Sequence, residues 1–192
     1  MKHVYFFSKS HTDGDRDMRS LLGGKGANLA EMTRLGVPVP PGFTITTEVC
    51  RHHLIAHELP DRAEEQVDEA IRRLEKMTGK QFGGAEDPLL LSVRSGGAVS
   101  MPGMMDTILN LGLNDDTVEA LVRVSDNDAF AYDSYRRFLQ MYGDVVMEVE
   151  HDWFEAILAD VRRQAGVQTD YELDCEALRS VVSRYKQLIA DK

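Results

Sequence analysis

Apolar residues return at helical spacing in several parts of the chain. The clearest case lies between residues 61 and 78, where the apolar positions are Ala63, Val67, Ala70, Ile71, Leu74 and Met77. Because side chains about three or four positions apart share one face of a helix, this stretch is predicted to be an amphipathic helix with its apolar face in the core. The same spacing predicts helices over 26–35, 131–142, 154–161 and 178–189, so the carboxy-terminal third is expected to be helical.

Other apolar stretches are too short for helices and predict strands. Residues 1–7 and 43–45 are two of these stretches, and the run Leu89-Leu-Leu-Ser-Val93 is typical of a buried strand. The mixture of elements predicts an α/β or α+β fold with a short mixed sheet. The last helix continues to Lys192 with no closing element, so we expect the chain to be a fragment of a larger multidomain protein.

Composition and charge narrow the range of functions. The 192 residues are 43% hydrophobic and 28% charged, which is ordinary for a globular protein long enough to form a sizeable core. No apolar run approaches the roughly 20 residues that a membrane span needs, so we expect no membrane partner. A formal net charge of -10 would repel nucleic acid. The two cysteines, Cys50 and Cys175, have no metal or redox spacing, and the cytoplasm is the expected compartment.

The segment Leu21-Leu-Gly-Gly-Lys-Gly-Ala-Asn-Leu-Ala-Glu-Met32 surrounds one lysine, Lys25, with glycines at the expected start of a helix. Free backbone N–H groups at a helix start favour anions, and glycines let a phosphate approach the backbone while the ammonium group neutralises its charge. The segment is not a Walker A loop, which needs Gly-x4-Gly-Lys-Ser/Thr. Two interpretations stay open: a site for a polyphosphate, or a glycine-rich turn whose lysine points into water.

Arg94 follows the apolar run of residues 89–93 directly, which places it at the end of a strand. The planar guanidinium fork suits bidentate contact with phosphate, and sheet proteins commonly bind ligands at strand ends. Arg94 is therefore a candidate phosphate ligand. The structural alternative is a salt bridge, to Asp87 or to Asp106.

The segment Gly96 to Gly103 follows Arg94 and has only small residues near its start. Such a loop can fold over a nucleotide and exclude water, which strengthens electrostatic interactions during phosphoryl transfer. Met101, Met104 and Met105 lie within or directly after it and offer polarizable surface for an adenine ring, although methionine also serves simply to fill irregular gaps in a core.

Two arrangements of possible metal ligands do not form a convincing site. His53 and His57 are one helical turn apart, but no third ligand follows at a usual spacing. The alternating aspartates between residues 13 and 17 resemble the start of a calcium loop, yet Met18 stands where that loop requires glycine. We therefore predict no metal site within these 192 residues.

The stretch Phe130-Ala-Tyr-Asp-Ser-Tyr-Arg-Arg-Phe138 combines aromatic and charged residues at helical spacing. Its simplest interpretation is a helix with one buried and one charged face, in which Arg136 and Arg137 belong to the charged face. No histidine of the chain lies in an obviously reactive setting. This region therefore suggests packing rather than chemistry.

Taken together, these segments closely resemble pyruvate, phosphate dikinase. The resemblance covers Leu21–Met32, Val37–Thr47, Glu86–Asn114 and Phe130–Val149. The glycine-lysine and proline-glycine segments also occur in phosphoenolpyruvate synthases and other dikinases. The stretches Ser100–Asn114 and Phe130–Phe138 look specific to the pyruvate, phosphate dikinase branch.

The resemblance implies the amino-terminal segment of an ATP-grasp nucleotide-binding domain. Residues 1–115 would form the first part of the nucleotide-binding lobe, and residues 116–192 a truncated helical segment of the same domain. In this family, ATP, phosphate and pyruvate become AMP, pyrophosphate and phosphoenolpyruvate through a phosphohistidine, with Mg²⁺. Carried over by motif, Lys25 and Arg94 match catalytic ATP-phosphate ligands. The ATP-binding positions implied are Lys25, Arg94, Ser95, Gly96, Gly97, Ser100, Met101 and Gly103.

The same resemblance implies partners that this chain lacks. The magnesium ligands, the phosphohistidine domain and the pyruvate-binding domain would all follow Lys192, and the parent protein would be a homodimer. The fragment alone is therefore expected to be inactive. One departure concerns the loop, where many relatives read Gly-Ala-Arg-Ala-Ser and this chain reads Gly96-Gly-Ala-Val-Ser100. The alternatives are a phosphoenolpyruvate synthase-type water dikinase or a nucleotide-binding module without catalysis.

Overall fold

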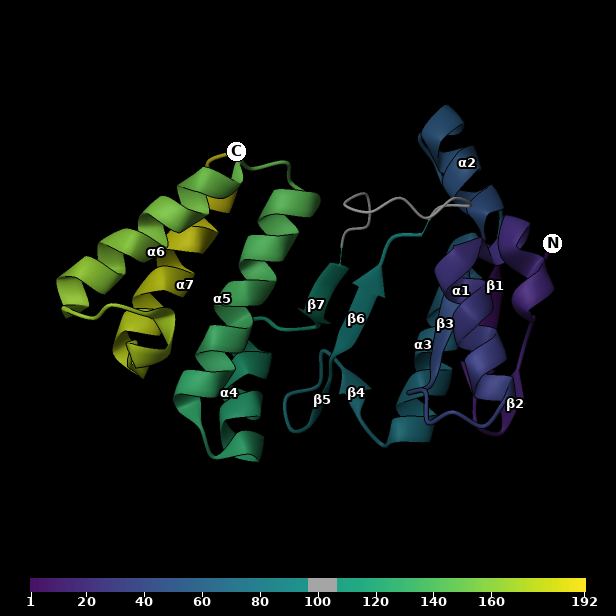
Figure 1. The fold of residues 1–192 in the computed structure, drawn as a ribbon, viewed down its shortest axis with the longest axis horizontal. Helices are drawn as coiled ribbons and strands as arrows, with labels where there is room; N and C mark the ends of the chain where they lie inside the picture. Colours follow the sequence, from purple (N-terminus) through teal and green to yellow (C-terminus); the bar gives the residue numbers. More distant parts are fainter. Residues whose placement is uncertain (97–106) are drawn as a thin grey trace. The chain divides into compact units, whose positions relative to one another are not determined.

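The computed structural model describes residues 1–96 and 107–192 of the chain. These residues form two compact units, whose elements are labelled in Figure 1. The first unit contains residues 1–79 together with Ser95 and Gly96, and the second contains residues 80–94 and 107–192. Each unit has its own sheet strands, helices and buried residues, so each is described by itself.

A small antiparallel sheet organises the first unit. Its strands are β1 (Val4–Ser8), β2 (His11–Thr12) and β3 (Gly42–Ile45), in the order β2-β1-β3. The register pairs Tyr5 with Thr44 and Phe6 with Phe43. The remaining elements are the short helix η1 (Arg16–Met18) and the helices α1 (Arg19–Arg34), α2 (Thr47–Ala56) and α3 (Ala63–Thr78).

Helices α1 and α3 contact opposite faces of this sheet. Gly26 of α1 lies against Thr44, which is paired with Tyr5, whereas Arg73 of α3 lies over the ring of Phe6 at 4.0 Å. Successive strand residues point to opposite faces, so Tyr5 and Phe6 mark the two sides. The apolar core of the unit is Val4, Phe6, Phe7, Leu22, Ala27, Ala30, Val49, Ala63, Ala70 and Leu74.

One glutamine attaches the start of β1 to α3. The Gln66 Oε1 atom accepts hydrogen bonds from the backbone N–H groups of His3 at 2.7 Å and Val4 at 3.2 Å. Its Nε2 atom donates to the carbonyl of Met1 at 3.0 Å. The side chain thus satisfies backbone groups at the start of β1, as a neighbouring strand would.

The second unit consists of short strands followed by a helical bundle. Strands β4 (Gln81–Phe82) and β5 (Pro88–Leu89) pair in parallel, and β6 (Leu91–Arg94) and β7 (Thr107–Leu111) pair antiparallel with a register shift between Leu91 and Val93. The helices are α4 (Asp115–Ser125), α5 (Asp128–Val145), α6 (His151–Ala165), the short η2 (Asp170–Glu172) and α7 (Cys175–Ala190).

Side-chain caps begin three of these helices, and their apolar faces form the main core. The side chains of Asn114, Asn127 and Asp174 accept backbone N–H bonds in the first turns of α4, α5 and α7. Such caps satisfy N–H groups that have no partner within the helix. In the core, the rings of Phe154 and Tyr185 meet edge to face, with centroids 4.9 Å apart. Other fully enclosed members include Val118, Ala131, Leu158, Leu178 and Val181.

The structure confirms the mixed α/β class, the short sheets and the helical carboxy-terminal third. The helix expected over 61–78 is α3, although Met77 is 43% exposed rather than buried. The buried strand expected over 89–93 is wrong in part. It divides into β5 and β6 at Leu90, and residues 92–94 are exposed. The division at residue 115 stays a prediction.

Candidate functional site

The glycine-lysine segment forms a break inside α1. Gly23 has φ 69° and ψ 169°, which are not helical values, so a new helical start lies at Gly24 and Lys25. Only glycine adopts this conformation without a steric penalty. The first N–H groups of a helix carry partial positive charge and attract anions. The break therefore creates, within a longer helical stretch, the kind of terminus that binds phosphate.

The glycines around Lys25 have different tasks. A Cβ atom on Gly26 would lie 2.6 Å from Thr44 Cγ2 and 2.8 Å from Thr44 Oγ1, so the absence of a side chain lets α1 approach β3. A Cβ atom on Gly24 would have nothing within 4 Å. Gly26 is thus explained by packing, whereas the backbone at Gly24 faces open space that a ligand can enter.

The lysine itself does not extend freely into water. Lys25 is half-buried, and its Nζ atom donates to the backbone carbonyl of Ser95 at 3.2 Å. Both residues belong to the first unit. The ammonium group is therefore held at Ser95, which directly precedes the glycine-rich loop expected from the sequence. The sequence could not predict this contact, because Ser95 lies 70 positions after Lys25.

Arg94 ends β6 in the second unit, where its backbone pairs with Thr107. Its side chain is exposed and has no ion pair or hydrogen bond with a residue in the described part of the chain. The expected alternative partner Asp87 pairs instead with Lys80, with Nζ and Oδ1 2.8 Å apart. Asp106, the other alternative, lies outside the described residues. The guanidinium is thus available to an external anion as far as residues 1–96 and 107–192 are concerned.

The remaining site residues predicted from the sequence are divided between two groups. Ser95 and Gly96 are described, and a Cβ atom on Gly96 would have nothing within 4 Å. Gly97, Ser100, Met101 and Gly103 lie outside the described residues, as do the methionines considered for adenine contact. Lys25 belongs to the first unit and Arg94 to the second.

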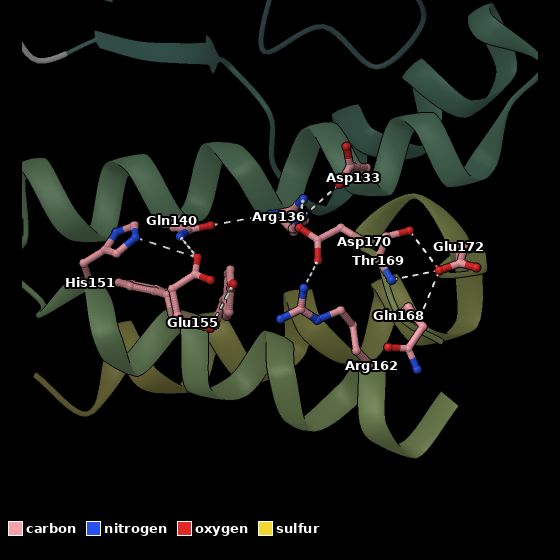
Figure 2. Close-up of polar contacts among 12 residues, drawn as sticks. Asp133, Arg136, Gln140, His151, Glu155, Arg162, Gln168, Thr169, Asp170 and Glu172 are labelled. Atoms are coloured by element: carbon pink, nitrogen blue, oxygen red, sulfur yellow. Dashed lines mark hydrogen bonds and ion pairs between the residues drawn. The ribbon is translucent and has the colours of Figure 1, made fainter. Parts of the chain in front are cut away.

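The sequence did not reveal a buried polar network in the second unit, which Figure 2 shows. Arg136 is only 4% exposed, although we expected it on the charged face of its helix. Its Nε atom lies 2.8 Å from Asp133 Oδ1, and one terminal nitrogen lies 3.4 Å from Asp170 Oδ2. Asp170 also pairs with Arg162 at 3.0 Å. The network ties α5, α6 and η2 together around one buried cation.

A second polar cluster links α4, α5 and α7. Lys186 Nζ lies 2.5 Å from Asp115 Oδ2, and the Tyr135 hydroxyl donates to Asp115 Oδ1 at 3.1 Å. The hydrogen bond from Lys186 is the main reason why the pKa of Asp115 lies below its usual range. Burial, with the nearby carboxylate charge, raises the pKa of Tyr135 above its usual range. These groups are paired with one another, which indicates a structural role.

Other classes of site receive no support from the described residues. Among residues 1–96 and 107–192, no group of three or more His, Cys, Asp or Glu side chains could hold a metal ion. No helix within the same ranges is both long enough and apolar enough to cross a membrane. The glycine-lysine turn and Arg94 therefore remain the leading candidates for chemistry.

Comparison with known proteins identifies the family. A family model described as the pyruvate phosphate dikinase AMP/ATP-binding domain matches residues 19–69 and 51–141, which include both Lys25 and Arg94. The chain belongs to the pyruvate, phosphate dikinase family. It is 53% identical over 191 residues to the pyruvate, phosphate dikinase of Rhizobium meliloti (strain 1021), covering 99% of this chain and 21% of that protein.

Other pyruvate, phosphate dikinases are nearly as similar. The protein from Clostridium symbiosum is 52% identical over 186 residues, which cover 96% of this chain and 21% of that protein. The chloroplastic protein from Mesembryanthemum crystallinum is 50% identical over 189 residues, covering 98% of this chain and 20% of that protein. The chain thus spans about a fifth of the length of these dikinases, and the resemblance expected from its motifs is confirmed.

Proposed function

We propose that this chain binds ATP as the amino-terminal part of an ATP-grasp domain in a pyruvate, phosphate dikinase. The observation that carries the proposal is the break at Gly23, which gives a helical start beside Lys25 with open space at Gly24. The match of this region to an AMP/ATP-binding domain supports the same conclusion. We take the helical start and Lys25 as the place where phosphate groups of ATP bind.

In this proposal Lys25 and Arg94 neutralise charge on the phosphates. Lys25 exchanges its contact with the Ser95 carbonyl for a phosphate oxygen, and the exposed Arg94 guanidinium supplies a bidentate contact. Positioning and charge stabilisation account for most of the catalysis of phosphoryl transfer. Gly97, Ser100, Met101 and Gly103 belong to the proposed site on the family resemblance, with Ser95 and Gly96 at its start.

The whole protein would use ATP, phosphate and pyruvate to make AMP, pyrophosphate and phosphoenolpyruvate through a phosphohistidine. On the family resemblance, we propose that the Mg²⁺ ligands lie in polypeptide beyond Lys192. The phosphohistidine and pyruvate-binding domains belong to that polypeptide too. We further propose a homodimer that works in the cytoplasm, although at least three relatives are chloroplastic proteins.

The test compares Lys25→Ala and Arg94→Ala with matched substitutions in the complete dikinase. Each is expected to slow ATP-dependent histidine phosphorylation at least about tenfold, which equals about 1.4 kcal/mol of transition-state stabilisation. Lys76→Ala and Arg51→Ala serve as controls, because both side chains are exposed cations on helices of the first unit and neither belongs to the glycine-lysine turn. Phosphorylation at the control rate in both site variants would refute the assignment.

A further inference from the structure

The break at Gly23 divides α1 into a first piece, residues 19–22, and a second piece that begins at Gly24. In a continuous helix the carbonyl of Ser20 would accept the N–H group of Gly24, four positions later. Because Gly23 has φ 69° and ψ 169°, the chain leaves the helical path between these two residues and this bond cannot form. The break therefore releases two groups at once: the Gly24 N–H group, which becomes available to an anion, and the Ser20 carbonyl.

The released carbonyl has a partner in a different helix. The hydroxyl of Thr47, in the first turn of α2, donates a hydrogen bond to the Ser20 carbonyl at 2.6 Å. This bond takes the place of the one that the carbonyl would accept from Gly24 in a continuous helix. An interaction that is made in one of two conformations shifts the equilibrium towards that conformation. A side chain 27 positions away in the sequence thus favours the broken form of α1.

Both pieces of α1 are attached to one short stretch of chain. In the second piece, Gly26 packs so closely on Thr44 that a Cβ atom would lie 2.6 Å from the Thr44 side chain. In the first piece, Ser20 is hydrogen-bonded to Thr47. The two threonines are three positions apart, where β3 ends and α2 begins, so one stretch of chain holds both sides of the break. The angle between the two pieces is therefore set by residues outside α1.

We propose that Thr47 is a positioning residue for the ATP site, because it holds α1 in the broken form that leaves the Gly24 N–H group available to phosphate. The inference rests on the function proposed above, since it concerns the same helical start. Thr47 itself does not contact ATP. Without its hydroxyl, part of the population adopts the continuous helix, in which Ser20 accepts the Gly24 N–H group. The apparent affinity for ATP then falls in proportion to the fraction of molecules in the broken form.

The adjacent threonine provides a matched control. Thr46 is 1% exposed, and its hydroxyl has no hydrogen-bond partner among residues 1–96 and 107–192. Its structural contribution comes from the backbone, whose N–H group donates to the carbonyl of His3 at 3.0 Å. Replacing either threonine with valine removes one hydroxyl and keeps a side chain branched at Cβ. Within the described part of the chain, only the change at Thr47 removes a hydrogen bond.

Single-turnover histidine phosphorylation in the complete dikinase, measured over a range of ATP concentrations, tests this inference. Thr47→Val should raise the ATP concentration that gives half the maximal rate by about two- to tenfold, the range expected for one neutral hydrogen bond. The maximal rate should stay within about twofold of that of the unaltered enzyme, because bound ATP selects the broken helix. Thr47→Ser keeps the hydroxyl and should restore the half-saturating concentration. Thr46→Val should leave both quantities unchanged.

Equal half-saturating concentrations in Thr47→Val and Thr46→Val would overturn the inference. A lower melting temperature of Thr47→Val with an unchanged dependence on ATP would overturn it too, because Thr47 would then have a structural role alone. Lys25→Ala in the same assay separates this inference from the proposed function. If Lys25→Ala slows phosphorylation and Thr47→Val has no effect, only the role of Thr47 is wrong. If Lys25→Ala has no effect, the phosphate site itself is wrong.

Discussion

Replacement of Arg136 by methionine tests whether the buried network supports the second unit. The change removes a cation that pairs with both Asp133 and Asp170 and whose side chain is only 5% exposed. Breaking a buried ion pair from one side typically costs about 3–5 kcal/mol, because the remaining charges lose their partner. Both carboxylates keep a second arginine, Arg137 at 2.7 Å and Arg162 at 3.0 Å. We therefore expect the lower end, about 3 kcal/mol.

The assay is urea unfolding followed by the fluorescence of Trp153, the single tryptophan of the chain, which lies on α6. This probe reports on the second unit separately from the first. Arg137→Met is the matched control, because Arg137 binds the same Asp133 with a side chain 47% exposed. An exposed pair is worth about 0–1 kcal/mol. If Arg136→Met lowers the free energy of unfolding by no more than Arg137→Met, the buried network does not stabilise the second unit.

Two further predictions concern packing and pH. Gly26→Ala should destabilise the first unit by about 1–3 kcal/mol, because the added Cβ would overlap Thr44. Gly24→Ala is the control and should change stability by less than about 0.5 kcal/mol. Thermal melts followed by circular dichroism compare the two variants, and equal melting temperatures would contradict the packing role of Gly26. The pKa of Asp115 is lowered in the fold, so its pairing contributes stability above the ordinary value of 3.8, which is lost as pH falls below that value. Lys186→Met should make the stability of the second unit less dependent on pH in the acid range, as followed by Trp153 fluorescence. An unchanged dependence on pH would show that the Asp115–Lys186 pair does not contribute to it.

Local patterns were enough to predict much of the fold. The helix α3 follows from the spacing of its apolar residues, and the helical start at Lys25 follows from the glycines around it. Both features depend on a few neighbouring residues, which the sequence displays directly. The same is true of the family, because the stretches that look specific to it, Ser100–Asn114 and Phe130–Phe138, are compact.

Features that depend on distant residues could not be predicted. Arg136 and Arg137 are adjacent and chemically identical. Arg136 is nevertheless buried, and its guanidinium donates a hydrogen bond to Asp170, which lies 34 positions later. The contact of Lys25 with the Ser95 carbonyl spans 70 positions. The exposure of Ser92, Val93 and Arg94 was also missed, because an apolar run favours a buried strand whatever elements lie around it.

The attachment of β1 through Gln66 has a consequence for the order of events during synthesis. The glutamine lies 63 positions after His3, whose N–H group it accepts. At about 5–20 residues per second, a ribosome adds those residues in roughly 3–13 s. During this interval the amino-terminal strand lacks its helical anchor. The contact between β1 and α3 therefore forms only after Gln66 has been added to the chain.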